Sequence, residues 1–232
     1  MIRLFKPLLA AAVGVLIATA ASAQQPPTDR EIAVYAGLHA AAAEGNVEEI
    51  ERLIREGENP NVQDSRSRTP LHVAAYRKHH KAVETLLRLG ANPNALDLQR
   101  LDIVTIAAMQ NDLELLKIAL KGGAKPDNVT SQSDASALIH AAHLGHVEIV
   151  RALIEARANL DHVNQLRFSA LIVAVVLGNG GKNYVETIDL LVKAGADTEL
   201  KDRQGMTALA HARARGYTDM VKILEGASGR KT

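Results

Sequence analysis

Histidines are the residues in this chain whose side-chain chemistry is most evident. The chain has 232 residues, with nine histidines and no cysteine. His140, His143 and His146 follow one another at intervals of three, which places their rings near one face of a helix. Imidazole nitrogens bind zinc and related metals, but neither a carboxylate pair nor a cysteine accompanies these three to complete a tetrahedral site. We therefore expect no metal or cofactor, and keep a metal-handling or stress-protective protein as the alternative function.

Motifs for catalysis are missing from the sequence. There is no G-x-S-x-G elbow, H-E-x-x-H helix, Walker loop or G-x-G-x-x-G turn. The run Gly178-Asn179-Gly180-Gly181 is rich in glycine, but no strand precedes it, so it is a weak phosphate cradle. The absence of cysteine excludes a thiol nucleophile, a zinc–thiolate site and disulfides. The sequence predicts a non-catalytic protein.

The N-terminal segment has the pattern of an export signal. Arg3 and Lys6 precede an uncharged apolar run over 8–21, and the small-x-small sequence ends at Ala23. The run has about 14 residues, fewer than the roughly 20 that a membrane-spanning helix needs. We predict a signal peptide over 1–23 that is cleaved between Ala23 and Gln24, followed by a linker over 24–29. The expected location is the periplasm, with full secretion as the alternative.

Composition limits the class of partner. Apolar residues make up 47% and charged residues 23%, as in folded soluble domains, and the 3% of aromatic residues favours helices over a β-sandwich. Loss of Arg3 and Lys6 with the signal leaves 25 basic residues against 26 acidic ones. Nucleic-acid-binding domains are normally strongly basic. We expect a protein partner, no nucleic acid, and no stable membrane insertion after cleavage.

A motif recurs along the chain from residue 38 onward. In the segment Thr69-Pro70-Leu71-His72-Val73-Ala74-Ala75, the leucine before the histidine has equivalents at intervals of 33, 33, 34, 33 and 38 residues. These aligned positions are Leu38, Leu71, Val104, Leu138, Leu171 and Leu209. With the Gly-Ala pairs that end most units, this pattern resembles the ankyrin repeat family over about 30–227.

The resemblance implies an all-α solenoid of about six helix-turn-helix repeats joined by hairpin loops. We place the repeats at 30–61, 62–94, 95–128, 129–161, 162–199 and 200–227, with a flexible tail over 228–232. In the second repeat we expect helices over about 70–77 and 81–89, with Thr69 as the first N-cap and Gly90 as the second C-terminal cap. In the first repeat, the capping box formed by Thr28 and Glu31 predicts a longer helix that extends through Leu38.

The resemblance also assigns roles to side chains. It implies that His39, His72, His79 and His146 hold backbone groups. It implies a concave binding surface made of the residues that follow each Ala-Ala pair and of the hairpin tips. The candidate binding residues on this surface are Tyr76, Arg77, Met109, Gln110, His143, Leu144, Val176, Leu177, Leu98, Leu101, Leu166 and Phe168. Several are apolar where a solvated face would be polar, which favours a protein contact made by a monomer.

Three questions stay open at this stage. The five extra residues of the fifth repeat fall in the segment 178–184, which is either a binding loop or tolerated loop growth. A basic cluster in the second repeat could steer an acidic partner, although our default interpretation is an ordinary solvated face. Its members are Arg66, Arg68, Arg77, Lys78, His79, His80 and Lys81. An exported effector that acts in a host would share the same fold.

Overall fold

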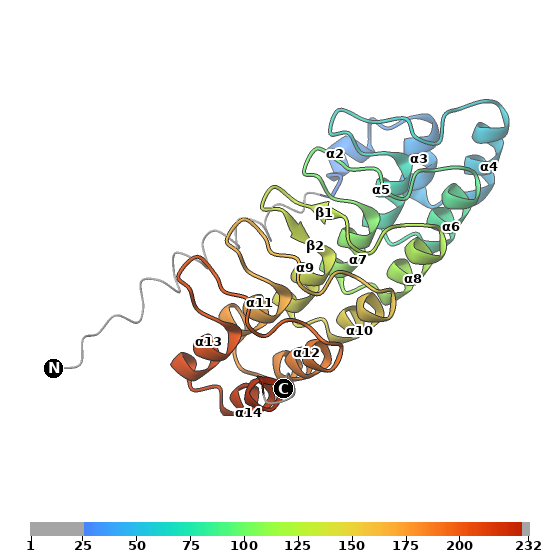
Figure 1. Ribbon diagram of the computed structural model, residues 1–232. Helices are drawn as coiled ribbons and strands as arrows, with labels where there is room; N and C mark the ends of the chain where they lie inside the picture. The colour runs from blue at the N-terminus through green and yellow to red at the C-terminus, as the bar shows by residue number, and fades with distance from the viewer. Residues whose placement is uncertain (1–25, 229–232) are drawn as a thin grey trace.

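The computed structural model describes residues 26–228, and over this part the chain is a stack of six helix pairs (Figure 1). The pairs are α3 (Gly37–Glu44) with α4 (Val47–Arg55), α5 (Pro70–Tyr76) with α6 (His80–Arg88), α7 (Ile103–Gln110) with α8 (Leu113–Lys121), α9 (Ala137–Leu144) with α10 (Val147–Glu155), α11 (Ala170–Val176) with α12 (Lys182–Lys193), and α13 (Ala208–Arg215) with α14 (Thr218–Ser228). The solenoid predicted from the repeat is confirmed. The predicted signal peptide and its cleavage site lie outside the described residues.

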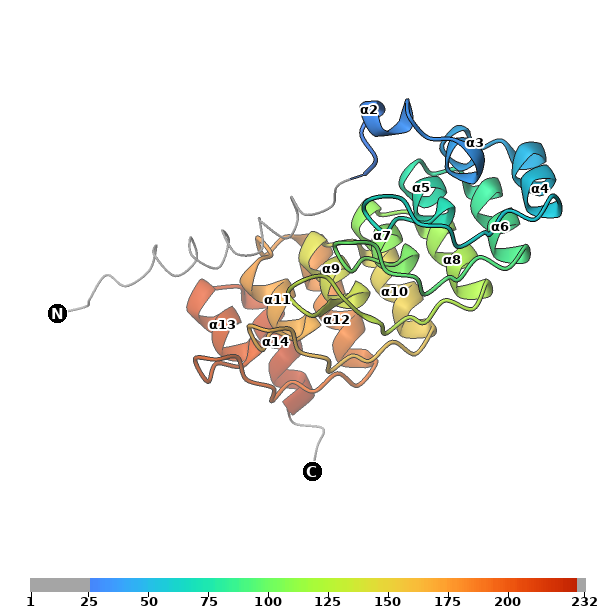
Figure 2. The ribbon, with the colours of Figure 1, turned by 90° about the horizontal axis from the view of Figure 1, so that it is seen from above.

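Each first helix packs on the first helix of the next pair, and each second helix packs on the next second helix. The pairs follow one another in chain order from one end of the stack to the other (Figures 1 and 2). Alanines make this close packing possible, since Ala74, Ala75, Ala107, Ala108 and Ala141 are fully buried between neighbouring helices. Leucine, isoleucine and valine from both helices of every pair complete one continuous core.

Polar side chains fix where the helices begin. Ser169 Oγ and Thr207 Oγ1 accept hydrogen bonds from the backbone N–H three residues later, as N-caps do. In the second repeat Pro70 is the first helical residue, and His72 Nδ1 accepts from the Thr69 N–H at 3.1 Å. The predicted left-handed cap at Gly90 is present, with φ at +94°.

The hairpins project in a row on the side of the first helices (Figure 1). One of them contains the strands β1 (Val129–Thr130) and β2 (Ala135–Ser136), which pair antiparallel. The other four hairpins share one hydrogen-bonding pattern. In each, the side-chain Oδ1 of an Asp or Asn accepts hydrogen bonds from the backbone N–H groups two and four residues later. These residues are Asp64, Asp97, Asn164 and Asp202.

The first repeat differs from its prediction. The capping box of Thr28 and Glu31 is present, but its helix α2 (Asp29–Ile32) has four residues and does not reach Leu38. The chain turns and α3 starts afresh at Gly37, whose φ is +54°. Because Ala36 supplies no side-chain cap, Glu58 Oε2 accepts from the Leu38 N–H at 3.2 Å. A Cβ on Gly37 would lie 2.8 Å from that carboxylate oxygen, and the positive φ also favours glycine there.

The fifth repeat absorbs its extra residues in two places. Helix α12 has 12 residues, where α4, α6, α8 and α10 have nine each. The remaining extra residues lengthen the turn over 177–181. The prediction of a single loop over 178–184 was therefore too long, since Asn183 and Tyr184 belong to the first turn of α12.

Candidate protein-binding site

The candidate surface consists of the C-terminal ends of the first helices and the tips of the hairpins, and we call it the inner surface. Most of the predicted binding residues are accessible on it. Arg77 is exposed and Leu98 is 61% exposed. Those of intermediate exposure are Met109, Gln110, His143, Leu144, Leu166, Val176 and Leu177. The accessible apolar residues therefore extend over several successive repeats.

Three of the predicted binding residues are buried, which corrects the expectation that they are exposed. Tyr76 is 6% exposed and its hydroxyl donates to Asp97 Oδ2 at 2.9 Å. Burial together with this carboxylate raises the pKa of the phenol. Leu101 and Phe168 are 2% and 3% exposed. Each follows an arginine with positive φ, Arg100 or Arg167, which returns the chain toward the core before the next helix.

Next to Tyr76, Gln110 links two repeats. Its Nε2 donates to the Tyr76 carbonyl at 3.3 Å. Its Oε1 is buried and has no hydrogen-bond partner within the described part of the chain. Gln110 is thus a structural contact as well as part of the inner surface.

The four histidines expected to hold backbone groups do so. The rings of His39 and His79 donate from Nε2 to the carbonyls of Arg68 and Ala43, at 2.8 and 3.0 Å. His72 Nε2 lies 3.1 Å from the carbonyl oxygens of both Ala95 and Leu101. His146 donates from Nδ1 to the Ala108 carbonyl at 2.8 Å. Each of these bonds joins one repeat to its neighbour.

His140, His143 and His146 do not converge on one point. His140 is 6% exposed, and its Nε2 has no hydrogen-bond partner among the described residues. It lines a cavity of about 20 Å³, room for one water molecule, together with His143 and Asn164. Burial lowers the pKa of His140 to about 4 and also lowers that of His143. Across residues 26–228 no group of three His, Asp or Glu side chains could hold a metal, so the metal-handling alternative gains no support.

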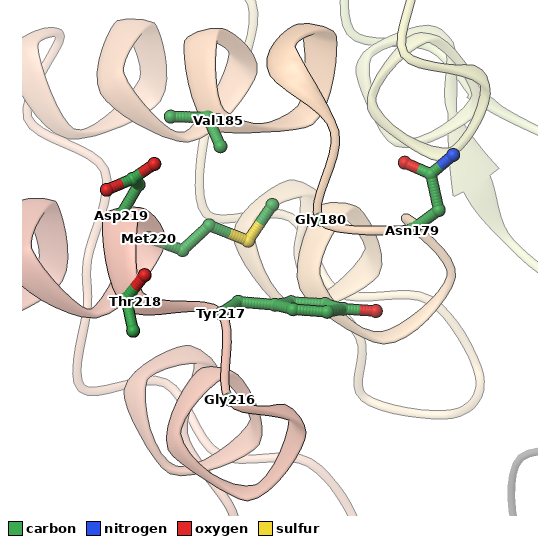
Figure 3. Close-up of a pocket in the computed structure, with 8 residues that line it drawn as sticks. All are labelled: Asn179, Gly180, Val185, Gly216, Tyr217, Thr218, Asp219 and Met220. Carbon is green, nitrogen blue, oxygen red and sulfur yellow. The ribbon is translucent and has the colours of Figure 1, made fainter.

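Two tyrosines in the fifth and sixth repeats take the place of the turn histidines, which sequence reasoning did not anticipate. Tyr184 and Tyr217 donate from their hydroxyls to the carbonyls of His143 and Gly178, at 3.1 and 3.2 Å. Tyr217 lies beside the inserted turn (Figure 3), in a cavity of about 160 Å³. This cavity is lined by Asn179, Gly180, Val185, Gly216, Tyr217, Thr218, Asp219 and Met220. The available signal was an aromatic residue at this turn in the second, fourth, fifth and sixth repeats, where the first and third have Asn46 and Asp112.

The basic cluster of the second repeat is divided by the fold. Arg68 is 1% exposed, and its guanidinium donates to Asp64 Oδ2 at 2.7 Å and to Glu31 Oε1 at 2.9 Å. Arg66 donates to the same Glu31 oxygen at 2.8 Å. Hydrogen bonds from the Thr28 N–H and, to a smaller extent, from Arg68 lower the pKa of Glu31 from 4.5 to about 2. These arginines fasten α2 to the first hairpin.

The other members of the cluster have different surroundings. His79 donates to the Ala43 carbonyl of the preceding repeat, and His80 Nε2 lies 2.8 Å from Asp112 Oδ2 of the next repeat. Arg77, Lys78 and Lys81 are exposed. The cluster is therefore not one continuous patch.

A family model that describes three copies of the ankyrin repeat matches residues 15–97 and 104–202, which together are more than half of the chain. The chain belongs to the ankyrin repeat family. Its sequence is 31% identical to the Escherichia coli K12 ankyrin repeat protein YahD over 98 residues, which are 42% of this chain and 49% of that protein. It is 38% identical to mouse protein phosphatase 1 regulatory subunit 27 over 81 residues, 34% of this chain and 49% of the relative. The matches thus span about half the length of these two curated relatives.

Solved ankyrin repeat structures are similar over most of the chain. An ankyrin repeat domain from Acinetobacter baumannii has a TM-score of 0.79 and 39% identity, covering 82% of this chain and 97% of that one. A second ankyrin repeat protein has a TM-score of 0.76 and 30% identity, covering 83% and 98%. A chain from the complex of a Bdellovibrio bacteriovorus predatory endopeptidase with its immunity protein shares the fold, with a TM-score of 0.68 and 24% identity over 83% of this chain and 98% of that one.

Proposed function

We propose that this ankyrin repeat protein is an exported, non-catalytic scaffold that holds a protein partner on its inner surface. The observation that carries the proposal is the set of partly exposed apolar side chains on that surface. Met109, Leu144 and Leu177 lie at the ends of three successive first helices, and Leu98 is on a hairpin tip. Apolar side chains that follow one another across repeats are typical of a protein contact.

The frame that presents these side chains is ordered before a partner binds. Backbone bonds join successive hairpins, from the Leu98 N–H to the Arg66 carbonyl at 2.8 Å and from the Ser131 N–H to the Arg100 carbonyl at 3.1 Å. A third runs from the Gln165 N–H to the Ser133 carbonyl at 3.0 Å. A surface that is already ordered loses little conformational entropy on binding, which favours affinity through shape complementarity.

Substitutions on two faces test this function. Met109, Leu144 and Leu177 would be changed together to serine in the full-length chain, and crosslinked partners would be captured from the periplasmic fraction. The matched control changes Leu87, Leu113 and Ile118, which are apolar residues of similar intermediate exposure on the second helices. We expect loss of specific partners from the first variant alone. Loss from the control alone would assign binding to the opposite face.

Export is the second part of the proposal, and it rests on the pattern of residues 1–23. Across the described residues, no helix is long and apolar enough to cross a membrane. We expect a mature chain that begins at Gln24 and is released by osmotic shock. Intact mass measured on each cell fraction checks this. A protein that keeps Met1 and remains with the membrane fraction would contradict it.

A further inference from the structure

Several cations on the side of the inner surface have no carboxylate partner within the described part of the chain. Arg77 and Lys78 are exposed where α5 ends, and Arg100 and Arg203 are exposed at hairpin tips. Arg167, on a third tip, donates from Nε to the Lys201 carbonyl at 3.4 Å. Within residues 26–228 none of these five makes an ion pair. We call the five residues the basic rim.

Many cations of the second helices are neutralised within the chain. Arg52 lies 2.7 Å from both Glu49 and Glu56, and Arg88 lies 2.6 Å from Glu51 of the preceding repeat. Arg151 and Lys193 pair with acidic residues in the same way. Residues 26–228 contain 23 basic and 26 acidic side chains. The unpaired rim therefore results from the placement of charge and not from an excess of basic residues.

Three rim residues have a backbone conformation that residues other than glycine seldom adopt. Lys78, Arg100 and Arg167 have φ of +58°, +63° and +59°. The residues equivalent to the two arginines in the other hairpins are Ser67, Asp134 and Gly205, so one carboxylate lies in the row between Arg100 and Arg167. The hairpin's own side-chain hydrogen bonds come from Asp97 and Asn164. The guanidinium groups are not needed for the turns and stay available at the tips.

We infer, on the basis of the proposed function, that the partner contributes a segment in which carboxylates alternate with apolar side chains, and that this segment binds along the basic rim. Charge complementarity accounts for the carboxylates. The apolar side chains match Leu98, which shares a tip with Arg100, and Met109, which ends the helix next to that of Arg77.

The described aromatic residues argue against single-stranded nucleic acid as the occupant. Such ligands stack their bases on exposed aromatic rings. The hydroxyls of Tyr35, Tyr76, Tyr184 and Tyr217 are all bonded within the stack. Phe168 is buried. Tyr76, which directly precedes Arg77 of the rim, is buried as well, so exposed cations beside accessible apolar side chains fit an acidic polypeptide better.

A peptide-binding measurement on the full mature chain tests the inference. The probe is a fluorescent peptide of Glu-Glu-Leu repeats, compared with Glu-Glu-Ser repeats and with an oligothymidylate of equal length. The rim variant combines Arg100→Glu, Arg167→Glu and Arg203→Glu. The matched control combines Arg55→Glu, Lys81→Glu and Lys117→Glu, which are exposed residues of the second helices without an ion pair within residues 26–228. Both variants change net charge equally.

We expect the Glu-Glu-Leu probe to bind best, to weaken with added salt, and to lose about tenfold in affinity for the rim variant alone. Equal losses in both variants, no binding of this probe, or tighter binding of the oligothymidylate would overturn the inference. Thermal unfolding of both variants checks that they fold. The two proposals can fail separately. If the Met109, Leu144 and Leu177 variant loses its native partners while the rim variant binds the probe normally, the scaffold function is supported and the inference of an acidic partner segment is wrong.

Discussion

At the scale of single residues, an aromatic ring at the turn between paired helices links neighbouring repeats. His79 and His146 donate to a carbonyl through a ring nitrogen, and Tyr184 and Tyr217 donate through a hydroxyl. Two side-chain chemistries thus satisfy one kind of backbone acceptor at the end of a helix. The longer reach of tyrosine suits the fifth repeat, where the turn has grown.

Tyr184→Phe isolates this bond because it keeps the ring and removes the donor to the His143 carbonyl. We expect the free energy of unfolding to fall by about 0.5–1.5 kcal/mol. Tyr184→Ala also removes the ring that packs over Gly145, so it should cost more. Urea unfolding measures both. Wild-type stability in both variants would show that the contact is not used.

His140 makes stability depend on pH. Burial, followed by the charge of His143, lowers its folded-state pKa from 6.5 to about 4. Between these values the unfolded chain binds more protons, so stability decreases as pH falls from 6.5 to 4. The expected loss is about 2–3 kcal/mol.

His140→Val is the test, because valine stands at the same repeat position in Val73 and Val173. Urea unfolding at pH 7 and pH 4.5 should show a smaller loss of stability in the variant than in the wild type. The lowered pKa of His143 should leave part of the dependence in place. The same loss in both proteins would contradict this account.

At the scale of elements, sequence reasoning worked where the signal is local and periodic. The repeat located the helix pairs, and Thr28, Pro70 and Gly90 marked ends that the structure contains. Sequence reasoning failed where residues distant in the chain determine where a helix begins. Glu58, twenty-one residues after Gly37, occupies the N-terminal end of α3, so a single helix through Leu38 does not form.

Sequence reasoning was likewise right for some candidate binding residues and wrong for others. Sequence register identified Met109 and Leu144 as accessible, but it placed Leu101 and Phe168 on the surface as well. Their burial depends on the positive φ of the preceding arginine, a conformation that a non-glycine sequence does not indicate.

The inserted turn of the fifth repeat depends on a glycine. A Cβ on Gly178 would lie 2.2 Å from the Ala174 carbonyl oxygen and 2.7 Å from the Tyr184 ring. Gly178→Ala should therefore lower the free energy of unfolding by about 2 kcal/mol or more. Gly226→Ala is the control, because it lies within α14 with open space around it and should be neutral or slightly stabilising. Equal stability of the two variants in urea would show that the turn relaxes freely.

At the scale of the whole molecule, stability is shared between neighbours along the stack. Ile188 and Leu191 of α12 are fully buried, and α12 packs on α14, which contributes Met220 and Leu224. A chain that ends at Asp197 would expose this face. We expect a clear fall in the thermal unfolding midpoint, since each repeat is stabilised by its neighbours. An unchanged midpoint would contradict a continuous stack.

Site-specific photocrosslinking in living cells would show directly whether the partner lies on the inner surface. A photoreactive amino acid would replace Leu144 on the inner surface in one strain and Ile118 on the second helices in another. Both residues are of intermediate exposure, so neither probe is buried. We expect a discrete crosslinked partner from position 144 and none from position 118. A partner crosslinked at position 118 alone would contradict this expectation.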